Sequence, residues 1–563
     1  MSEEGSHIQD QLMKMRREAE ERDAKRRAES HGLPYLPPSK IVVNLEALSV
    51  LPEEQIKEGQ CAVIAIRDKK IALVTYDPKY SKTVEIIGDL KNKEYKINIF
   101  VASLSSLEYI GSFYKFVQKK REVISGKVKV GRENDKKSVG EIKTALDSVD
   151  SVKKTLDEHS NAGQISDIVE IILWGAMGNR ASDIHLEPSQ DFVKLRYRID
   201  GNLNNIFDKF SLGTYKAILS RIKLLSNLKL NVKDEPQDGR FTINLPNKDV
   251  EVRVAIAPSE FGEVVVMRLL DPDAINLTLQ DLGFRDDDLK IVEEQLNKPY
   301  GMALNTGPTG SGKTTTLYAF LRHKISSEIK IITIEDPIEY HLKGIEQTQV
   351  NNEAGYSFAS GLRSLMRQDP DVILVGEIRD KETAEIAVQA ALTGHLVFST
   401  VHANESASAV PRLVDLGVKA ASLAPALNLL IAQRLVRRLC KFCKVKEKTI
   451  NNELWEMIKK YVEAMPARVD KEKYLKNIEI YKPASCDKCN NTGYKGRVGI
   501  YELLVINEKI QELIMKEAGQ LEIEKEIKST DFVSMKQDGV LKLISGLTTL
   551  EEIEDVAGKV EWI

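Results

Sequence analysis

The sequence contains no apolar run of about 20 residues, the length that a membrane-spanning helix needs. Its first residues also lack the pattern of a signal peptide. A strong charge is missing too, since 81 Lys and Arg face 84 Asp and Glu, for a net charge of −3. Proteins whose main partner is nucleic acid usually carry a basic excess, so this balance argues against such a partner. We expect any membrane association to go through a partner protein.

Cysteine is scarce as well. Only five occur, and four of them form two Cys-x-x-Cys pairs, Cys440 with Cys443 and Cys486 with Cys489. This usage indicates a reducing compartment and a metal site, with disulfide bonds as the alternative. A tetrahedral Zn²⁺ needs four ligands, and each pair can supply two thiolates. The spacing between the pairs exceeds that of usual zinc ribbons, so we expect the polar stretch between them to form an arm outside the site.

A chain of 563 residues is too long for one hydrophobic core and is expected to form several domains. Its first 30 residues carry eight acids and seven Lys or Arg, which predicts a charged arm, helical or disordered, over residues 1–40. The regions predicted after it are a small α/β domain, a Lys-, Ser- and Gly-rich linker, an α+β domain and a larger domain of alternating strands and helices: 41–118, 119–160, 161–272 and 280–563. That alternation predicts a doubly wound, mainly parallel sheet, interrupted by a cysteine-bearing insertion at 440–489.

The strongest motif is a phosphate loop. An apolar strand, GMALNT, leads into GPTGSGKT, and a helical pattern follows. The glycines let backbone N–H groups converge on phosphate oxygens, and the helix presents its positive end. Lys313 is expected to reach the β- and γ-phosphates, and the Thr314 hydroxyl to bind Mg²⁺. The predicted nucleotide-binding residues are Gly307, Pro308, Thr309, Gly310, Ser311, Gly312, Lys313, Thr314 and Thr315.

Two later apolar strands deliver carboxylates. Residues 331–334 precede Glu335, and residues 372–375 precede Gly376 and Glu377. In open α/β sheets, ligands bind outside the carboxyl ends of the strands. Glu377 is therefore predicted to orient or deprotonate the attacking water. Because glycine precedes it, Mg²⁺ is expected to rest on the Thr314 hydroxyl, phosphates, waters and the Glu335 region. Helix capping is the alternative role of such carboxylates.

Two histidines, His395 and His402, flank a further buried strand in TGHLVFSTVHANES. Histidines in such places are commonly hydrogen-bonded core residues. A strand that ends beside the phosphates can instead use an imidazole to sense the γ-phosphate. Both interpretations stay open at this point, so both histidines are candidate catalytic residues.

Four stretches together resemble one family: GPTGSGKTTTLYA, IEDPIEY, SLMRQDPDVILVGEIRD and STVHAN are similar to the Walker A, Asp box, Walker B and His box of the secretion ATPase superfamily. That family reads Gly-Glu in Walker B where others read Asp-Glu. RASDIHLEP, RYRIDG and PQDGR resemble the domain before its motor, and GRVGIYELL and SGLTTLEEI resemble its tail. The resemblance covers roughly residues 160 to 560. It implies a RecA-like P-loop ATPase core preceded by smaller α+β domains.

The two cysteine pairs make the chain similar to type II secretion and type IV pilus assembly ATPases, whereas the pilus retraction branch usually lacks them. The resemblance implies a homohexameric, cytoplasmic, Mg²⁺-dependent ATPase that binds ATP and Zn²⁺. It further implies that the ring powers assembly of a pilus or pseudopilus through platform proteins at the inner membrane. The alternatives are a DNA-uptake or conjugation ATPase and a non-hydrolysing nucleotide switch. The near-neutral charge counts against the first, and the presence of Lys313 and Glu377 against the second.

The stretches GLPYL and QCAVIAIRDKKIALVTYDP are similar to the second half of the family's N-terminal domain, which docks onto membrane-platform components. In some relatives a preceding segment binds cyclic di-GMP through a repeat led by Arg-Leu-Gly. That repeat is not found in this sequence, so regulation by cyclic di-GMP is not expected.

Arginines are the last candidates. Arg198 in RYRIDG and Arg240 in PQDGR match the family's pre-motor domain, which closes over the nucleotide, so at least one is expected to reach the γ-phosphate. The alternative makes both ordinary surface residues, and the search then moves to Arg363, Arg367 or Arg379. The basic run RLVRRLCKFCK is predicted to be a helix leading into the zinc site, with a nucleic-acid patch as the alternative.

Overall fold

The computed structural model describes residues 17, 19–41, 43–48, 50–51, 53–67, 69–92, 95–115, 127–129, 146–159, 164–245, 248–447, 452–476 and 478–562. These form two compact units, Met1–Ser125 and Gly126–Ile563, which are considered separately. The boundary between the units falls inside the predicted linker, while much of residues 119–160 lies outside the described residues. Among the described helices, none combines the length and apolarity that a membrane crossing requires.

The first unit is a small α/β domain. Its three strands lie in the order β1-β2-β3, with β1 and β2 antiparallel and β2 and β3 parallel. The strands are β1 Cys61–Arg67, β2 Lys70–Thr75 and β3 Lys96–Val101, and the helices are α2 Leu45–Leu48, α3 Glu53–Gly59, α4 Ser81–Asn92 and α5 Leu104–Ser112.

The described part of the charged arm belongs to this first unit. Residues 19–30 are helical, and Ala24 and Ala28, four residues apart on one face, are buried. The Glu21 carboxylate accepts hydrogen bonds from Tyr35 and Ser103. Of the two predicted forms of the arm, helical or disordered, these residues adopt the helix, and its Ala24 and Ala28 side chains are buried rather than solvated.

The second unit begins with a seven-stranded sheet in the order β4-β8-β9-β10-β5-β6-β7, antiparallel except between β4 and β8. Its strands are β4 Lys127–Lys129, β5 Ala181–Pro188, β6 Val193–Ile199, β7 Asn202–Phe210, β8 Gln237–Asn244, β9 Asp249–Ser259 and β10 Gly262–Leu270. Its helices are α7 Val149–His159, α8 Ile165–Gly178 and α9 Leu212–Leu225. Helix α7 lies within the predicted linker, yet Val152 and Leu156 are fully buried in the core of this sheet.

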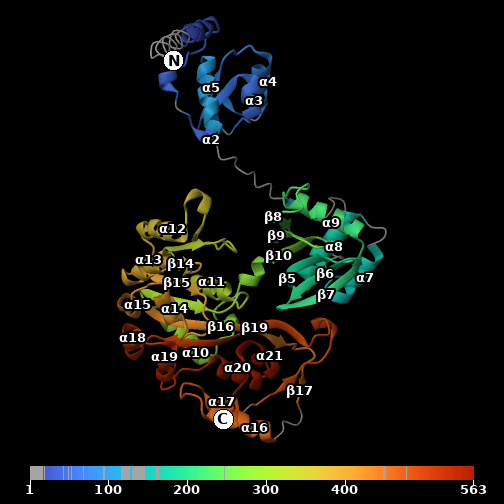
Figure 1. Cartoon of the computed structure of the whole chain (residues 1–563), viewed down its shortest axis with the longest axis vertical. Coiled ribbons are helices and arrows are strands. Elements are labelled where there is room, and N and C mark those ends of the chain that lie inside the picture. Colours follow the sequence, from blue (N-terminus) through green and yellow to red (C-terminus); the bar gives the residue numbers. More distant parts are fainter. Residues whose placement is uncertain are drawn as a thin grey trace, which may run out of the picture. The chain divides into compact units, whose positions relative to one another are not determined.

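The motor sheet has the order β13-β12-β14-β15-β11-β16-β19, and every neighbouring pair is parallel except β16 with β19. Most of its strands are buried throughout, as expected when helices cover both faces. The strands are β11 Gly301–Thr306, β12 Ile331–Glu335, β13 Glu346–Gln349, β14 Val372–Val375, β15 Leu396–Val401, β16 Leu427–Leu439 and β19 Tyr494–Val505. The predicted fold class, a doubly wound P-loop core after smaller α+β domains, is confirmed (Figure 1).

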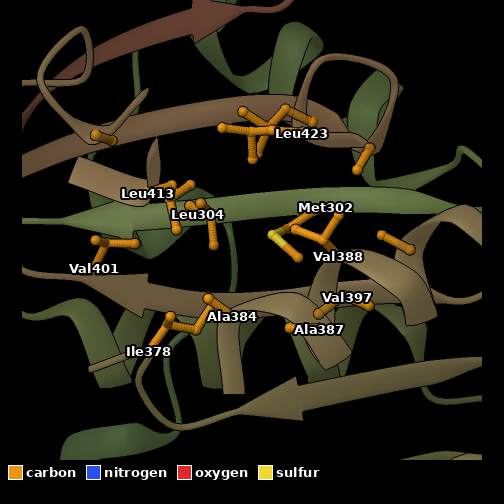
Figure 2. Close-up of a cluster of buried hydrophobic side chains, with 14 of the residues drawn as sticks. Met302, Leu304, Ile378, Ala384, Ala387, Val388, Val397, Val401, Leu413 and Leu423 are labelled. Atoms are coloured by element: carbon orange, nitrogen blue, oxygen red, sulfur yellow. The ribbon is translucent and has the colours of Figure 1, made fainter. Parts of the chain in front are cut away.

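Separate hydrophobic clusters cover the two faces of this sheet. On one face, Met302 of β11 and Val397 of β15 meet Ala384, Ala387 and Val388 (Figure 2). The small alanines let helix α13 lie close to the strands. The helices of this face are α12 Phe358–Leu365, α13 Lys381–Leu392, α14 Ala409–Asp415, α15 Ala420–Ala426, α18 Glu508–Met515 and α19 Gln520–Ile527. Helices α10 Asp286–Leu296 and α11 Lys313–Lys324 cover the other face.

Two predictions for the C-terminal part are wrong. The basic run after Arg434 continues strand β16 and is not a helix, because it pairs with β19 along its length. The stretch between the cysteine pairs is not a separate arm, since Ile458 and Val462 pack with Val540 and Leu541. Its elements and those it packs against are β17 Val445–Lys446, β18 Tyr481–Lys482, α16 Asn452–Glu463, α17 Lys471–Lys476, α20 Met535–Ile544 and α21 Leu550–Ala557.

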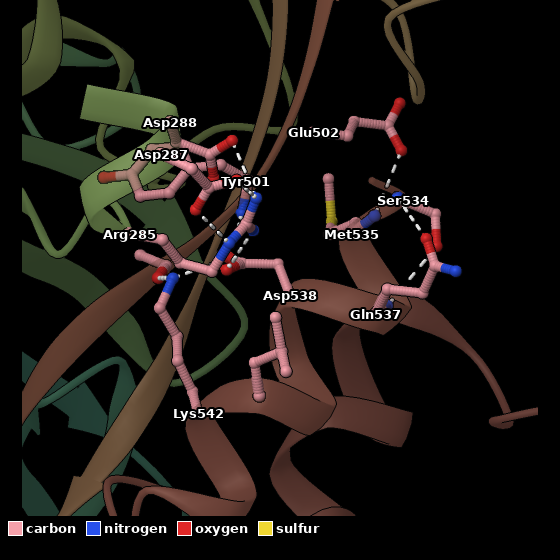
Figure 3. A network of polar contacts seen from close by, with 12 residues as sticks. Arg285, Asp287, Asp288, Tyr501, Glu502, Ser534, Met535, Gln537, Asp538 and Lys542 are labelled. Atoms are coloured by element: carbon pink, nitrogen blue, oxygen red, sulfur yellow. Dashed lines mark hydrogen bonds and ion pairs between the residues drawn. The ribbon is translucent and has the colours of Figure 1, made fainter. Parts of the chain in front are cut away.

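A buried ionic network joins α10 to α20 (Figure 3). The Arg285 guanidinium, 3% exposed, lies 2.8 Å from carboxylate oxygens of both Asp288 and Asp538. Lys542 lies 2.6 Å from Asp538, and the Tyr501 backbone N–H donates to the same carboxylate at 2.8 Å. Burial acts to raise the pKa of Asp538, but Lys542 and Arg285 hold it below its ordinary value. Arg468 also lies 2.7 Å from Asp288. Each acid in the network therefore has more than one cation beside it, and removal of one cation leaves the buried group with an excess of negative charge.

We expect Arg285→Ala to destabilise the second unit by about 3–5 kcal/mol, because the buried acids then outnumber Lys542 and Arg468, the cations that remain in contact with them. The matched control is Lys473→Ala, which breaks an exposed pair with Asp286 on the same helix and is expected to cost no more than about 1 kcal/mol. Urea unfolding followed by tryptophan fluorescence measures both. Equal shifts of the unfolding midpoint in the two variants would contradict the central role of the network.

Candidate functional site

The phosphate loop joins β11 to α11, as the sequence predicts. Three of its glycines have left-handed backbones, with φ of +143° at Gly307, +81° at Gly310 and +90° at Gly312. A Cβ at Gly307 would lie 2.6 Å from the Gln433 carbonyl oxygen and 2.7 Å from Ser311 Oγ. Both the backbone conformation and the close approach therefore require glycine. The loop wraps around the start of α11, where backbone N–H groups are available to an anion.

Lys313 begins α11 and turns back over the loop. Its Nζ donates to the carbonyl oxygens of Gly307 at 2.8 Å and Pro308 at 3.0 Å. Burial lowers the pKa of Lys313, while the charge of Glu377 opposes that shift. Ser311 Oγ is buried with no hydrogen-bond partner among the described residues. A half-buried ammonium, an unpartnered hydroxyl and free helix N–H groups are donors that fit nucleotide phosphates.

Glu377 follows β14 at the same edge of the sheet, with its side chain 15% exposed. One carboxylate oxygen lies 2.5 Å from Arg379 Nε and 3.3 Å from His402 Nε2. The Ile378 N–H donates to the Thr400 carbonyl at 2.9 Å, which fixes the strand end that carries Glu377. The structure thus brings Glu377 and His402 together beside the phosphate loop.

Packing does not by itself impose glycine before Glu377. A Cβ at Gly376 would lie 3.4 Å from the Ile334 carbonyl oxygen and from Glu335 Cα, which is tolerable contact. The residue that replaces the usual aspartate is therefore not explained by crowding. What the structure adds is that the Gly376 carbonyl accepts a hydrogen bond from Thr400 Oγ1 at 3.0 Å.

Glu335 occupies a different environment. Its side chain is buried and accepts hydrogen bonds from Tyr318 at 2.5 Å, Thr333 at 2.7 Å and Gln347 at 3.1 Å. Three donors therefore already hold this carboxylate in the interior of the motor. Burial, with the charge of Glu335, raises the pKa of Tyr318, so that hydroxyl stays a donor. This placement favours positioning of α11 over a direct role in the reaction.

The geometry contradicts a γ-phosphate sensor at His395. Its Nδ1 lies 2.9 Å from the Ala390 carbonyl at the end of α13, and its own carbonyl accepts from Gly301 N–H. Gly301 begins β11, whereas the phosphate loop follows the other end of that strand. The sequence could not separate the two histidines, because both flank the same strand and only its direction decides which one meets the phosphates.

Arg198 and Arg240 contact residues of the pre-motor sheet to which they belong. Arg198 Nη1 donates to the Gly201 carbonyl at 2.9 Å, and Arg240 lies 3.9 Å from Glu251. Among the fallback candidates, Arg363 pairs with Glu382 at 2.6 Å, Arg367 donates to the Arg363 carbonyl at 2.9 Å, and Arg379 contacts Glu377. Of these five arginines, only Arg379 contacts a residue of the predicted catalytic set in this conformation.

Two residues beside the phosphate loop were not singled out by the sequence analysis. Gln433 Oε1 accepts hydrogen bonds from Asn305 Nδ2 and Thr316 Oγ1, each at 2.8 Å, and so ties β11 and α11 to β16. Arg434 lies beside it, and its Nη1 would be 3.1 Å from a Cβ at Gly307. The available signal was the polar pair that ends the apolar run LNLLIA. This signal was not recognised because the run that begins at Arg434 was predicted to be a helix.

The four cysteines of the two pairs lie together, with all sulfurs within 4.8 Å of one another. Cys440 and Cys486 are 3.9 Å apart, Cys443 and Cys489 3.7 Å, and Cys486 and Cys489 3.6 Å, measured between Sγ atoms. Ligands about 2.3 Å from a tetrahedral Zn²⁺ would be roughly 3.8 Å apart. The donor set and its spacing fit this ion, and the Gly493 N–H donates to Cys489 Sγ at 3.3 Å.

The loop after Cys489 also contacts the domain before the motor. The Asn490 side chain, from a left-handed backbone, donates to Asn179 Oδ1 at 2.9 Å and accepts from the Val149 N–H at 3.0 Å. The Gly496 N–H donates to Asp200 at 2.8 Å. The cysteine cluster therefore also anchors a contact within the second unit.

A doubly wound sheet with a phosphate loop after one strand, and a glutamate after another strand at the same edge, defines the P-loop nucleoside-triphosphatase class. Within that class, the model of the type II/IV secretion system protein family matches residues 158–555. The chain belongs to this family, as the sequence motifs predicted. ATPase activity is supported by that membership.

Relatives agree with this assignment. The type IV pilus assembly ATPase TfpB of Acinetobacter baylyi is 38% identical over 531 residues, which span 93% of this chain and 86% of that protein. The type II secretion system ATPase E of Vibrio cholerae is 43% identical over 396 residues, 70% of this chain and 76% of that protein. The crystal structure of the ATPase DotB of Yersinia pseudotuberculosis is similar in fold, with a TM-score of 0.52, 20% identity and coverage of 71% of this chain and 95% of that one.

We expect the purified, untagged protein to contain one Zn²⁺ per chain by elemental analysis, since the four thiolates match its preferred geometry. Cys486→Ser should lower the content to less than about 0.2 per chain and destabilise the C-terminal region, because structural zinc couples to folding. Cys61→Ala, which changes the cysteine outside the cluster, serves as control and should keep the metal. A wild-type protein without zinc, although its thiols are free, would refute the site.

Proposed function

We propose that this chain is an ATP-hydrolysing motor that powers assembly of a type IV pilus or of a type II secretion pseudopilus. The observation that carries the proposal is the convergence of Lys313, Glu377 and His402 at one edge of the motor sheet. The relatives named as pilus assembly and type II secretion ATPases support the biological setting. DNA translocation has no comparable support, because the charge balance supplies no basic excess.

In the proposed reaction, the loop N–H groups and Lys313 hold the phosphates of ATP. Glu377 accepts a proton from the attacking water or orients it, and His402, 3.3 Å from that carboxylate, positions Glu377 or meets the γ-phosphate. Thr314, exposed at the start of α11, would bind Mg²⁺, which would neutralise charge on the phosphates. Glu335 would assist indirectly, by fixing α11 through Tyr318.

The motor is proposed to act as a homohexamer in the cytoplasm, held at the inner membrane by platform proteins. Domain closure in each cycle would bring Arg198 or Arg240 from the pre-motor sheet to a γ-phosphate. Both arginines are at least one-third exposed, with weak ion pairs to their neighbours, so little energy opposes such a change of partner.

We expect Glu377→Gln to bind ATP with nearly wild-type affinity and to lose turnover, because an amide cannot accept the proton. Lys313→Ala should lose or severely weaken ATP binding, since the loop loses its charge. Calorimetric titration and phosphate release measure the two effects. Glu385→Gln, on the exposed face of α13, is the matched control and should hydrolyse ATP normally. Turnover of Glu377→Gln within a few-fold of wild type would refute the assignment.

The arginines are tested separately. Alanine at Arg198 or Arg240 should leave ATP binding nearly intact and cut turnover at least about tenfold in one of the two, equal to roughly 1.4 kcal/mol of transition-state stabilisation. Arg221→Ala, an exposed arginine of the same domain, should change neither quantity. If both single variants and the double variant keep full activity, closure by these residues is wrong and Arg363, Arg367 and Arg379 become the candidates.

A further inference from the structure

Strand β16 runs directly beside the strand that carries the phosphate loop. It pairs in parallel with β11, and the register matches Thr306 with Ala432. The next two residues of each strand therefore lie at the same edge. Arg434 reaches this edge, with Nη1 only 3.1 Å from the position of a Cβ on Gly307.

Among the described residues, the Arg434 guanidinium donates hydrogen bonds only to backbone carbonyl oxygens. Nη1 donates to its neighbour Gln433 at 3.0 Å, and Nη2 donates to Asn404 at 2.9 Å. Two carboxylates lie nearby, but Glu502 is occupied by Ser406, whose N–H and hydroxyl donate to it at 2.7 and 3.0 Å. The other, Glu405, accepts a hydrogen bond from Gln520. The positive charge of Arg434 is thus half-buried without an ion-pair partner in contact.

Around the phosphate loop as a whole, positive charge also exceeds the negative charge that is in contact with it. Besides burial, two nearby charges shift the pKa of Lys313: Glu377 raises it and Arg434 lowers it. The Glu377 carboxylate is itself in contact with Arg379. The two cations that face the phosphate loop therefore have little negative charge to neutralise them, and an anion bound in the loop would supply it.

We propose that Arg434 is a further phosphate-binding residue, whose guanidinium leaves the Asn404 carbonyl to bind the phosphates of the nucleotide. This inference rests on the proposed function, which makes ATP the anion. Arginine suits the task because its fork can bind two phosphate oxygens at once. Asn404 lies two residues after His402, so the same movement would free the loop that carries His402 when nucleotide binds.

The test is calorimetric titration of the full chain with ATP and ADP. We expect Arg434→Ala to raise the dissociation constant for ATP roughly tenfold or more, the usual effect of losing a charged hydrogen bond. Arg434→Gln can still donate to the Asn404 carbonyl but has no charge, so it should bind ATP as weakly as Arg434→Ala. Arg434→Lys keeps the charge and should recover part of the affinity.

The matched control is Arg438→Ala, an exposed arginine four residues further along the same strand, which should bind ATP normally. Melting temperatures without nucleotide identify a variant that fails to fold, and the Lys and Gln variants then decide, since both keep a donor. Wild-type affinity in Arg434→Gln, even with slower turnover, would overturn the inference and reduce Arg434 to a support of the loop. If the wild-type chain itself bound no ATP, the proposed function would fail as well.

Discussion

The pairing of β11 with β16 is the constraint on which the site depends. A phosphate loop binds an anion only if the strand before it and the backbone around it hold the loop N–H groups in place. Here β16 supplies the Gln433 carbonyl close to Gly307, and the Gln433 side chain joins β11 to α11. The same strand leads to Cys440. Cys440 lies six positions after Arg434, about 20 Å of extended chain. One strand thus links the phosphate loop to the cysteine cluster.

The C-terminal third stabilises that strand. Strand β19 pairs with β16 along its length, and the Tyr501 N–H of β19 donates to Asp538, the carboxylate shared by Arg285 and Lys542. Burying ions costs free energy of desolvation, and separating a buried ion pair costs more. Such a network therefore favours one arrangement of α10, α20 and the sheet. The segment between the cysteine pairs packs onto α20 and extends the same core. A tail of this kind gives the edge strand of the motor sheet little freedom to move.

Much of the site could be predicted from local sequence. The phosphate loop is a contiguous motif whose glycines have a steric reason, and Glu377 follows a run of four apolar residues that is typical of a buried strand. The cysteine pairs imply one cluster by their chemistry. Arg434 and Gln433 could not be predicted in the same way, because their role requires β16 to be a strand beside β11. Helix and strand are hard to distinguish in the mixed run RLVRRL, where tertiary pairing decides.

The sequence by itself determined the class of fold, the phosphate loop, the catalytic candidate Glu377 and the four thiolates. Each of these depends on residues that are adjacent in the chain or on chemistry that a residue type carries with it. Only the tertiary structure placed His402, and not His395, beside Glu377. It also enclosed the Glu335 carboxylate among three donors and placed Arg434 beside Gly307. Those outcomes depend on strand direction and strand order, which are set by long-range packing rather than by residues adjacent in the chain.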